Sequence, residues 1–350
     1  MRRIIRPTRG DPCMNEPFDV PDGDGYTGLH RDGPRLVCVL ALVPGPPAPV
    51  PLPNGPRTRV PVETMAACMA RSDARPLRVD VVTRTLVWWG DGPATRAYRG
   101  LLGPLAPASH RSVALVVHVD PAQHPQAVAL RGGGNIGALR TVLWCVRRVR
   151  AACASAGVQT RPLTAADLST DGAWTVADAT DAVARILPSG VEGVAPPLGG
   201  DGQLIGAADD GTPIALRVAG PFIPRVTVDA DLPTVRQTVV RALALGVRAH
   251  VVSDRPDQWT PLVDMIGDPL LLSYGPTVPP TSQVVVDDTP EQTVRHTGLT
   301  VIDVGDHGAA DGYLLRQEPD DSSVLHLIGP GGSRRTVRTV TTPAERALTG

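Results

Sequence analysis

Hydrophobic residues in the middle of the chain's first half recur with a helical period. The helix begins near residue 136 and stops at Gly157, which takes the C-terminal cap position. Its apolar residues are spaced three and four apart and form one stripe, which consists of Leu139, Val142, Val146, Val149 and Cys153. Arg140, Arg147 and Arg148 fall on the flank of this stripe. The pattern predicts an amphipathic helix of about five turns that covers one face of a sheet.

Short apolar runs surround this helix and alternate with further helical segments. Residues 36–43 form an unbroken apolar run, which is typical of a buried strand, and residues 79–83 alternate with period two. The expected elements are strands at residues 35–43, 77–86, 111–120 and 158–161, and helices at residues 60–69 and 94–102. This alternation predicts an α/β layered domain.

The second half opens with a hairpin signal and continues with the same alternation. Two short strands flank the turn Asp209-Asp210-Gly211, and a helix at residues 231–245 starts with Asp231 as its N-cap. The other expected elements are a helix at residues 257–266 and strands at residues 225–228, 247–252, 269–273, 283–286, 299–304, 313–316 and 324–328. The predicted fold class is α/β, with two layered α/β halves, mixed sheets and a β-rich C-terminal end.

Regions without periodicity set the expected domain boundaries. Residues 1–34 are polar and rich in Asp, Gly and Pro, and we expect a disordered tail there. Residues 169–202 are rich in Gly, Pro, Asp and Ala and are expected to be a linker. The predicted division is therefore a tail at 1–34, a first α/β domain at 35–168, a linker at 169–202, a second α/β domain at 203–330 and a tail at 331–350.

Composition excludes several classes of function. The sequence contains no lysine, so all 34 basic residues are arginine, and the formal net charge is -1. The absence of lysine excludes a P-loop ATPase and a Schiff-base enzyme, and the near-zero charge argues against a nucleic-acid-binding surface. The five cysteines are odd in number and form no C-x-x-C motif, which predicts reduced core thiols rather than a disulfide framework or a metal site.

A glycine motif before the long helix imitates a dinucleotide-binding fingerprint. Gly132, Gly134 and Gly137 match G-x-G-x-x-G, but the preceding strand ends near Val119, and Pro121 intervenes. In a dinucleotide fold the first glycine directly follows a strand, so that the helix N-terminus meets the pyrophosphate. We therefore expect a flexible joint that lets the helix pack closely, and no cofactor.

Two acidic motifs follow expected strands. Asp229 and Asp231 form a D-x-D, which could hold a divalent metal in a glycosyltransferase-like enzyme, although helix capping explains both residues more simply. Asp303, Asp306 and His307 could ligate a metal, but the glycines around them indicate a turn. We therefore expect neither motif to form a metal site, and the glycosyltransferase-like enzyme using Asp229 and Asp231 stays as the alternative function.

Several stretches resemble one known family. They are the run GGGNIGALR at residues 132–140 with the helix after it, TRPLTAADL at 160–168, RSVALVVHVDP at 111–121, VPVETM at 60–65 and LRVDVVT at 77–83. Across residues 35–272 the chain is similar to the cytosolic part of EccE, a membrane-complex component of the actinobacterial type VII (ESX) secretion system. EccE carries two transmembrane helices near its N-terminus, whereas this sequence has no apolar run of about 20 residues. A soluble version, a truncated gene model and a paralogue held at the membrane by partners all stay open.

The resemblance implies a role in assembly rather than catalysis. It implies a non-catalytic structural subunit at the cytosolic face of the cell membrane, with EccB-, EccC- and EccD-like neighbours and indirect membrane association through them. No catalytic motif of the family can be carried over to this chain. The charge pattern itself adds the predicted partner-contact residues Arg140, Arg147 and Arg148 on the flank of the long helix. They could meet a partner subunit or an anionic headgroup, and a solvated helix face is the more common reason for such a pattern.

Overall fold

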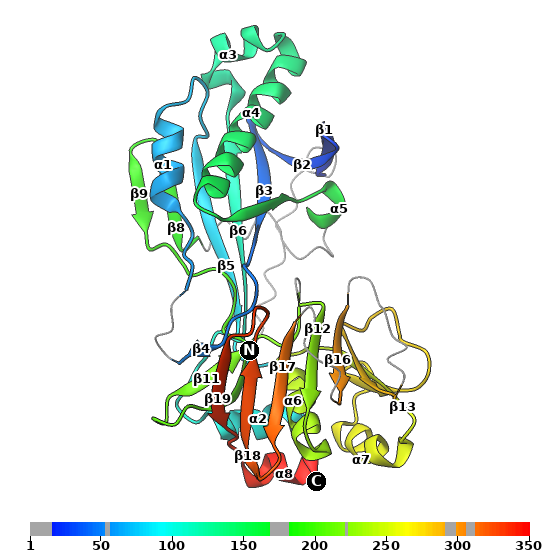
Figure 1. Ribbon diagram of the computed structural model, residues 1–350. Coiled ribbons are helices and arrows are strands. Elements are labelled where there is room, and N and C mark those ends of the chain that lie inside the picture. Colours follow the sequence, from blue (N-terminus) through cyan, green and yellow to red (C-terminus); the bar gives the residue numbers. More distant parts are fainter. Residues whose placement is uncertain (1–15, 53–56, 169–181, 221–222, 291–298, 306–311) are drawn as a thin grey trace. The chain divides into compact units, whose positions relative to one another are not determined.

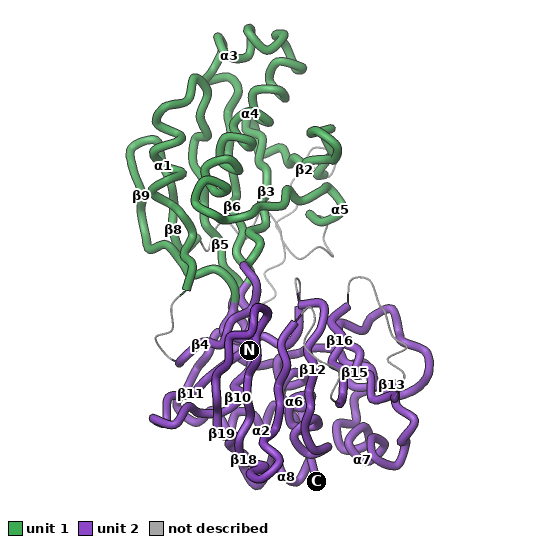
Figure 2. The backbone as a smooth tube through the Cα atoms, in the orientation of Figure 1, with its two compact units in different colours: residues 1–44, 57–84, 112–199 green, residues 45–56, 85–111, 200–350 purple. Residues whose placement is uncertain are grey.

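The computed structural model describes residues 16–52, 57–168, 182–220, 223–290, 299–305 and 312–350. The chain forms two compact units (Figure 2). Unit 1 contains residues 1–44, 57–84 and 112–199, and unit 2 contains residues 45–56, 85–111 and 200–350. Mixed and antiparallel sheets are combined with helices in both units, and strands dominate the C-terminal part, which confirms the predicted fold class.

Unit 1 is built on an eight-stranded sheet with the order β1-β2-β3-β6-β5-β8-β9, and β7 also pairs with β3. Its strands are β1 (Phe18–Asp22), β2 (Gly25–Asp32), β3 (Arg35–Val43), β5 (Arg78–Leu86), β6 (His110–Val119), β7 (Gln159–Pro162), β8 (Ala184–Leu187) and β9 (Gly190–Gly193). Its helices are α1 (Val62–Ala70), η1 (Pro121–Gln123), α3 (Pro125–Leu130), α4 (Gly134–Ser155) and α5 (Ala165–Leu168). The division between the units runs through β5 and β6.

The predicted amphipathic helix is α4, and its apolar stripe faces the sheet as expected. Val142, Val146 and Cys153 are fully buried and join a core that contains Leu115 of β6 and Met65 of α1. Helices α1 and α4 together cover this face of the sheet (Figure 1). The opposite face carries a smaller apolar cluster that Leu163 and Leu168 complete around α5.

Unit 2 is built on an eleven-stranded sheet with the order β14-β13-β15-β16-β12-β17-β18-β19-β10-β11-β4. The strands from β14 to β17 in this order are parallel, and those from β17 to β4 pair antiparallel. The first six in sequence are β4 (Val50–Pro51), β10 (Gln203–Ala207), β11 (Pro213–Leu216), β12 (Arg225–Asp229), β13 (Ala249–Ser253) and β14 (Leu272–Tyr274). The others are β15 (Val284–Asp288), β16 (Thr300–Val304), β17 (Tyr313–Glu318), β18 (Asp321–Ile328) and β19 (Arg334–Arg338). The helices are α2 (Pro93–Leu102), α6 (Leu232–Ala244), α7 (Pro256–Ile266) and α8 (Pro343–Thr349).

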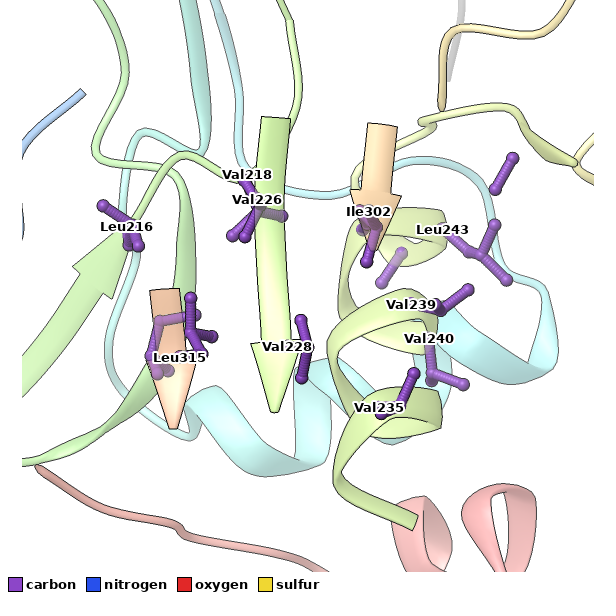
Figure 3. Close-up of a cluster of buried hydrophobic side chains, with 14 of the residues drawn as sticks. Leu216, Val218, Val226, Val228, Val235, Val239, Val240, Leu243, Ile302 and Leu315 are labelled. Carbon is purple, nitrogen blue, oxygen red and sulfur yellow. The ribbon is translucent and has the colours of Figure 1, made fainter. Parts of the chain in front are cut away.

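The core of unit 2 lies between α6 and the parallel strands. Val235, Val239 and Leu243 of α6 point toward Val226 of β12 and Ile302 of β16 (Figure 3). All five side chains are fully buried. The three- and four-residue spacing on α6 and the two-residue alternation on the strands produce the complementary apolar faces that this packing requires.

The predicted disordered tail at residues 1–34 is corrected by the structure from Phe18 onward. Strands β1 and β2 form a hairpin that pairs with β3. The Asp and Gly residues taken as a sign of disorder make the hairpin turn, where Gly23 has φ of +65°. Leu29 of β2 is fully buried, which anchors the hairpin to unit 1.

The predicted linker and the predicted C-terminal tail also differ from the structure. Within residues 169–202, β8 and β9 form a hairpin that extends the unit 1 sheet through β5, and residues 169–181 lie outside the described part. Within residues 331–350, β19 pairs with β18, and Val337 is fully buried. Helix α8 follows with Thr342 as its N-cap, because the threonine hydroxyl accepts the Glu345 amide at 3.2 Å. Both regions are structured because their strands complete sheets begun elsewhere in the chain.

Candidate functional site

The stretch around α3 and α4 is basic and lacks acidic residues. From residue 121 to residue 166 the sequence contains no Asp or Glu. Over the same stretch it contains Arg131, Arg140, Arg147, Arg148, Arg150 and Arg161. Any carboxylate that balances these charges must therefore come from another segment, and the structure shows which arginines are balanced in this way.

Arg147 is neutralised by the N-terminal hairpin. Its Nε donates to Oδ1 of Asp22 at 2.7 Å, and its Nη2 lies 2.6 Å from the same oxygen. Arg150 approaches the other carboxylate oxygen at 3.7 Å. Because the Asp22 side chain is only 4% exposed, the contact fastens β1 to α4. Arg147 therefore has a structural role within unit 1.

Arg140 and Arg148 lie apart from each other on α4. Arg140 is exposed, and its Nη1 donates to the backbone carbonyl of Arg131 at 3.2 Å. Arg148 is half-buried beside α1, where its carbonyl accepts the Cys68 thiol at 3.5 Å. The three arginines predicted as one partner-contact flank thus occupy three different environments. Of these, Arg140 is the exposed one without a carboxylate partner among the described residues.

Arg140 belongs to a surface that we call the α3–α4 corner, made of Leu130, Arg131, Ile136, Arg140 and Trp144. Leu130 is 84% exposed, Ile136 is 62% exposed and Trp144 is 38% exposed. Ile136, Arg140 and Trp144 are spaced four apart and therefore share one face of α4, away from its buried stripe. Helix α3 and the first turns of α4 form one end of unit 1 (Figure 1).

A carboxylate fixes the shape of the α3–α4 corner. Asp73 accepts a hydrogen bond from Arg131 Nη2 at 2.8 Å through one oxygen and from the Trp144 indole at 3.0 Å through the other. The Arg131 guanidinium also stacks 5.1 Å from the centre of the Trp144 ring. The hydrogen bond from Arg131 is the main reason that the pKa of Asp73 lies below its usual value. Asp73 is therefore ionised and cancels the charge of Arg131.

The glycines before α4 act as a packing joint, as expected. Gly132, Gly133 and Gly134 all have positive φ. A Cβ on Gly137 would lie 2.3 Å from the carbonyl oxygen of Val128, so only glycine lets α4 approach α3 this closely. The amides of Gly132, Gly133 and Gly137 donate to backbone carbonyls at 3.2, 2.9 and 2.8 Å. Because these donors are used internally, the motif does not present them to a phosphate.

In the D-x-D motif of unit 2, one aspartate caps a helix and the other pairs with an arginine of a neighbouring strand. Asp231 accepts the Thr234 amide at 3.0 Å and is the N-cap of α6, as predicted. Asp229 accepts a hydrogen bond from Arg316 Nε of β17 at 2.7 Å. Both carboxylates therefore have protein partners. This disfavours the alternative of a metal-dependent glycosyltransferase-like enzyme, because such an enzyme would need the carboxylates of Asp229 and Asp231 to bind the metal.

The acidic motif after β16 is described only at its first residue. Asp303 is buried and forms an ion pair with Arg225 of β12. Asp306 and His307 lie outside the described residues. In the described segments, no three His, Cys, Asp or Glu side chains gather as a metal site would require.

A buried charge cluster in unit 1 was not predicted. Asp80 of β5 is fully buried and lies 3.0 Å from Arg78 Nε, 2.8 Å from Arg185 Nε and 3.0 Å from His118 Nε2. Burial alone raises the pKa of the Asp80 carboxyl, but the hydrogen bonds from His118 and Arg185 and the charge of Arg78 outweigh it and lower that pKa. The cluster joins β5, β6 and β8. The sequence signal for it is the position of Asp80 between the apolar residues Val79 and Val81 of an expected strand, and all three residues are buried.

The described cysteines are free thiols and three are deeply buried. Burial raises the pKa of Cys38, Cys145 and Cys153 to about 12 in each case. These thiols therefore stay protonated and unreactive, which agrees with the predicted core role. Cys68 is half-buried, and Cys13 lies outside the described residues.

The comparison with known proteins matches one part of the chain to a family model. Residues 107–193 match the EccE family model. That family is described as "Putative type VII ESX secretion system translocon, EccE". No curated protein and no solved structure matches the chain. The match confirms the resemblance to EccE over these residues and indicates involvement in type VII secretion.

The EccE match coincides with the part of the chain that carries the α3–α4 corner. It runs from just before β6 to the end of β9, so residues 112–193 of the match lie in unit 1. Leu130, Arg140 and Trp144 all fall inside it. Across the described ranges, no helix is both long enough and apolar enough to span a membrane.

Proposed function

We propose that the protein is a non-catalytic structural subunit of a type VII protein secretion complex, docked at the cytosolic face of the membrane. The observation that carries this proposal is the EccE match over residues 107–193. The matched segment supplies β6, β7, β8 and β9 of the unit 1 sheet together with α3 and α4. We infer that EccB-, EccC- and EccD-like subunits are the neighbours, as in the family's complex.

The chemistry of the candidate residues supports a docking role. The aspartates of the D-x-D motif have partners within the fold. The amides of Gly132, Gly133 and Gly137 donate to backbone carbonyls. The α3–α4 corner, in contrast, presents apolar and cationic side chains outward from a rigid support. Exposed apolar side chains next to an unneutralised arginine are typical of an interaction surface.

The surroundings of the three arginines favour Arg140 as the contact residue to test. Arg147 is held by Asp22, so its replacement would loosen β1 as well as remove a charge. Arg140 is exposed and bonds only to a backbone carbonyl among its described contacts, so Arg140→Glu reverses a charge at little cost to the fold. Arg335 of β19 is also exposed and gives a matched charge reversal in unit 2.

The test is affinity purification of a tagged copy from native cells. Membranes would be solubilised in mild detergent, and co-purifying proteins would be quantified by mass spectrometry. We expect an FtsK-type ATPase and a multi-span channel subunit to co-purify with the wild-type protein and with Arg335→Glu, and less of both with Arg140→Glu. Recovery of the wild-type protein without any secretion subunit would contradict the proposed function.

A further inference from the structure

The α3–α4 corner combines apolar side chains that no other described part of the chain covers. Leu130 ends α3 and is 84% exposed, and Ile136 in the first turn of α4 is 62% exposed. Residues 121–130 contain no charged side chain, so α3 adds an uncharged surface beside them. Moving an apolar side chain of this size from water into a less polar medium lowers the free energy.

The charges around these side chains are mainly positive. Within the described ranges, Arg140 has only a backbone acceptor, whereas the charge of Arg131 is cancelled by Asp73. The loop after α1 adds the exposed Arg71 and Arg75, and the carbonyl of Arg75 lies 2.9 Å from His124 Nε2, just before α3. The corner therefore carries net positive charge next to its apolar tip.

We propose that the α3–α4 corner binds the surface of an anionic lipid bilayer directly. Leu130 and Ile136 enter the boundary between headgroups and acyl chains, and Trp144 lies at the headgroup level. The exposed Arg71 and Arg75 contact lipid phosphates, which leaves Arg140 to the protein contact of the proposed function. The indole N–H of Trp144 already donates to Asp73, which holds the ring in one orientation. Binding to the bilayer therefore costs little further side-chain entropy at Trp144. This contact goes beyond the proposed function, which assigns membrane association to partner subunits.

The exposure of Leu130 and Ile136 favours a bilayer over an acidic protein partner for this apolar tip of the corner. Protein interfaces concentrate their binding energy in side chains that enter well-packed pockets. Here Leu130 ends the short helix α3 and Ile136 lies in the first turn of α4, and both side chains are largely exposed. The two helices meet at one end of unit 1 (Figure 1). Two protruding aliphatic side chains with a tryptophan and arginines beside them match the way peripheral proteins meet a lipid surface.

The experiment is co-sedimentation of the purified full-length protein with lipid vesicles. One set of vesicles contains phosphatidylglycerol and phosphatidylcholine in equal parts, and the other contains phosphatidylcholine alone. We expect binding to the anionic vesicles that weakens as salt is added, and little binding to the neutral vesicles. Equal binding to both sets, or binding to neither, would overturn the proposal.

Variants locate the contact. The double variant Leu130→Ser with Ile136→Ser should lose binding to anionic vesicles by about tenfold, which corresponds to about 1.4 kcal/mol. Leu270→Ser is the matched control, because Leu270 of unit 2 is 70% exposed, and it should bind as the wild type does. Circular dichroism checks that each variant is folded. Unchanged binding by a folded double variant would overturn the proposal.

Testing the double variant in both experiments distinguishes the lipid proposal from the proposed function. If the double variant still purifies with the secretion subunits but does not bind vesicles, both proposals hold. If it keeps vesicle binding and loses the subunits, the corner contacts protein, and the lipid proposal is overturned while the proposed function stands.

Discussion

The guanidinium of Arg241 and the carboxylate of Glu345 form an ion pair inside unit 2, with Nε 2.7 Å from Oε1. Their side chains are 2% and 0% exposed. The other nitrogens of Arg241 donate to the carbonyls of Leu204 and Ile205, at 2.8 and 2.9 Å, and to that of Val340. One side chain of α6 thus holds β10 and the last helix of the chain, α8, and makes the C-terminal residues part of the core.

Removing Arg241 should destabilise unit 2 strongly. Arg241→Met leaves the Glu345 carboxylate buried without its charge partner and leaves backbone carbonyls without a donor. Loss of one partner of a buried pair costs about 3–5 kcal/mol. Urea unfolding followed by circular dichroism measures this change.

An exposed pair gives the control for this prediction. Arg99 and Asp91 lie 3.2 Å apart with side chains 48% and 85% exposed. Arg99→Met should cost no more than about 1 kcal/mol, because water screens such a pair. Equal costs for Arg99→Met and Arg241→Met would show that the buried network does not hold α8 in place.

Asp80 should make unit 1 sensitive to acid. Its pKa is lower in the folded protein than in the unfolded chain, so its ion pairs stabilise the fold fully above the unfolded pKa of about 4. This stabilisation is lost as the pH falls through the lower pKa of the folded state. Asp80→Asn leaves Arg78 and Arg185 without this counter-charge and should cost about 2 kcal/mol at neutral pH, since both arginines are partly exposed.

Unfolding measured against pH tests this linkage. The stability difference between the wild-type protein and Asp80→Asn should be constant near neutral pH and should shrink below about pH 4. A difference that does not change with pH would mean that hydrogen bonding, rather than charge, makes Asp80 important.

Gly137 should be irreplaceable at the crossing of α3 and α4. A Cβ would lie 2.3 Å from the Val128 carbonyl oxygen, so Gly137→Ala must push α3 away and should cost about 1–3 kcal/mol. Gly100 in the exposed part of α2 has no atom within 4 Å of its virtual Cβ, so Gly100→Ala should stabilise by about 0.5–1 kcal/mol. The unfolding temperatures of the two variants should therefore shift in opposite directions. A higher unfolding temperature for Gly137→Ala would contradict the claim that only glycine allows α3 and α4 to pack this closely.

Elements with strong local patterns could be predicted from the sequence. The apolar run predicted strand β3, which the structure has at Arg35–Val43. The apolar stripe and the glycine at its C-terminal end predicted helix α4. Asp231 was recognised as a cap because the residues that decide it are adjacent in sequence. In each case the physical cause lies within one turn or one strand.

The elements that were missed depend on distant partners. The N-terminal hairpin is polar and short, and it is held by Asp22 on Arg147, far along the chain. Helix α8 lies in the segment predicted as a C-terminal tail. It was missed because Glu345, which anchors it, is a charged residue that is buried through its ion pair with the distant Arg241. The α3–α4 corner had a local signal, which was the lack of acidic residues from 121 to 166 with Ile136 and Trp144 outside the apolar stripe.

Co-purification from native membranes tests the assignment to type VII secretion most directly. The tagged wild-type protein and Arg335→Glu should bring down an FtsK-type ATPase and a multi-span channel subunit in constant ratio, and Arg140→Glu should bring down less of both. A wild-type protein that purifies free of these subunits would contradict a structural role in the secretion complex.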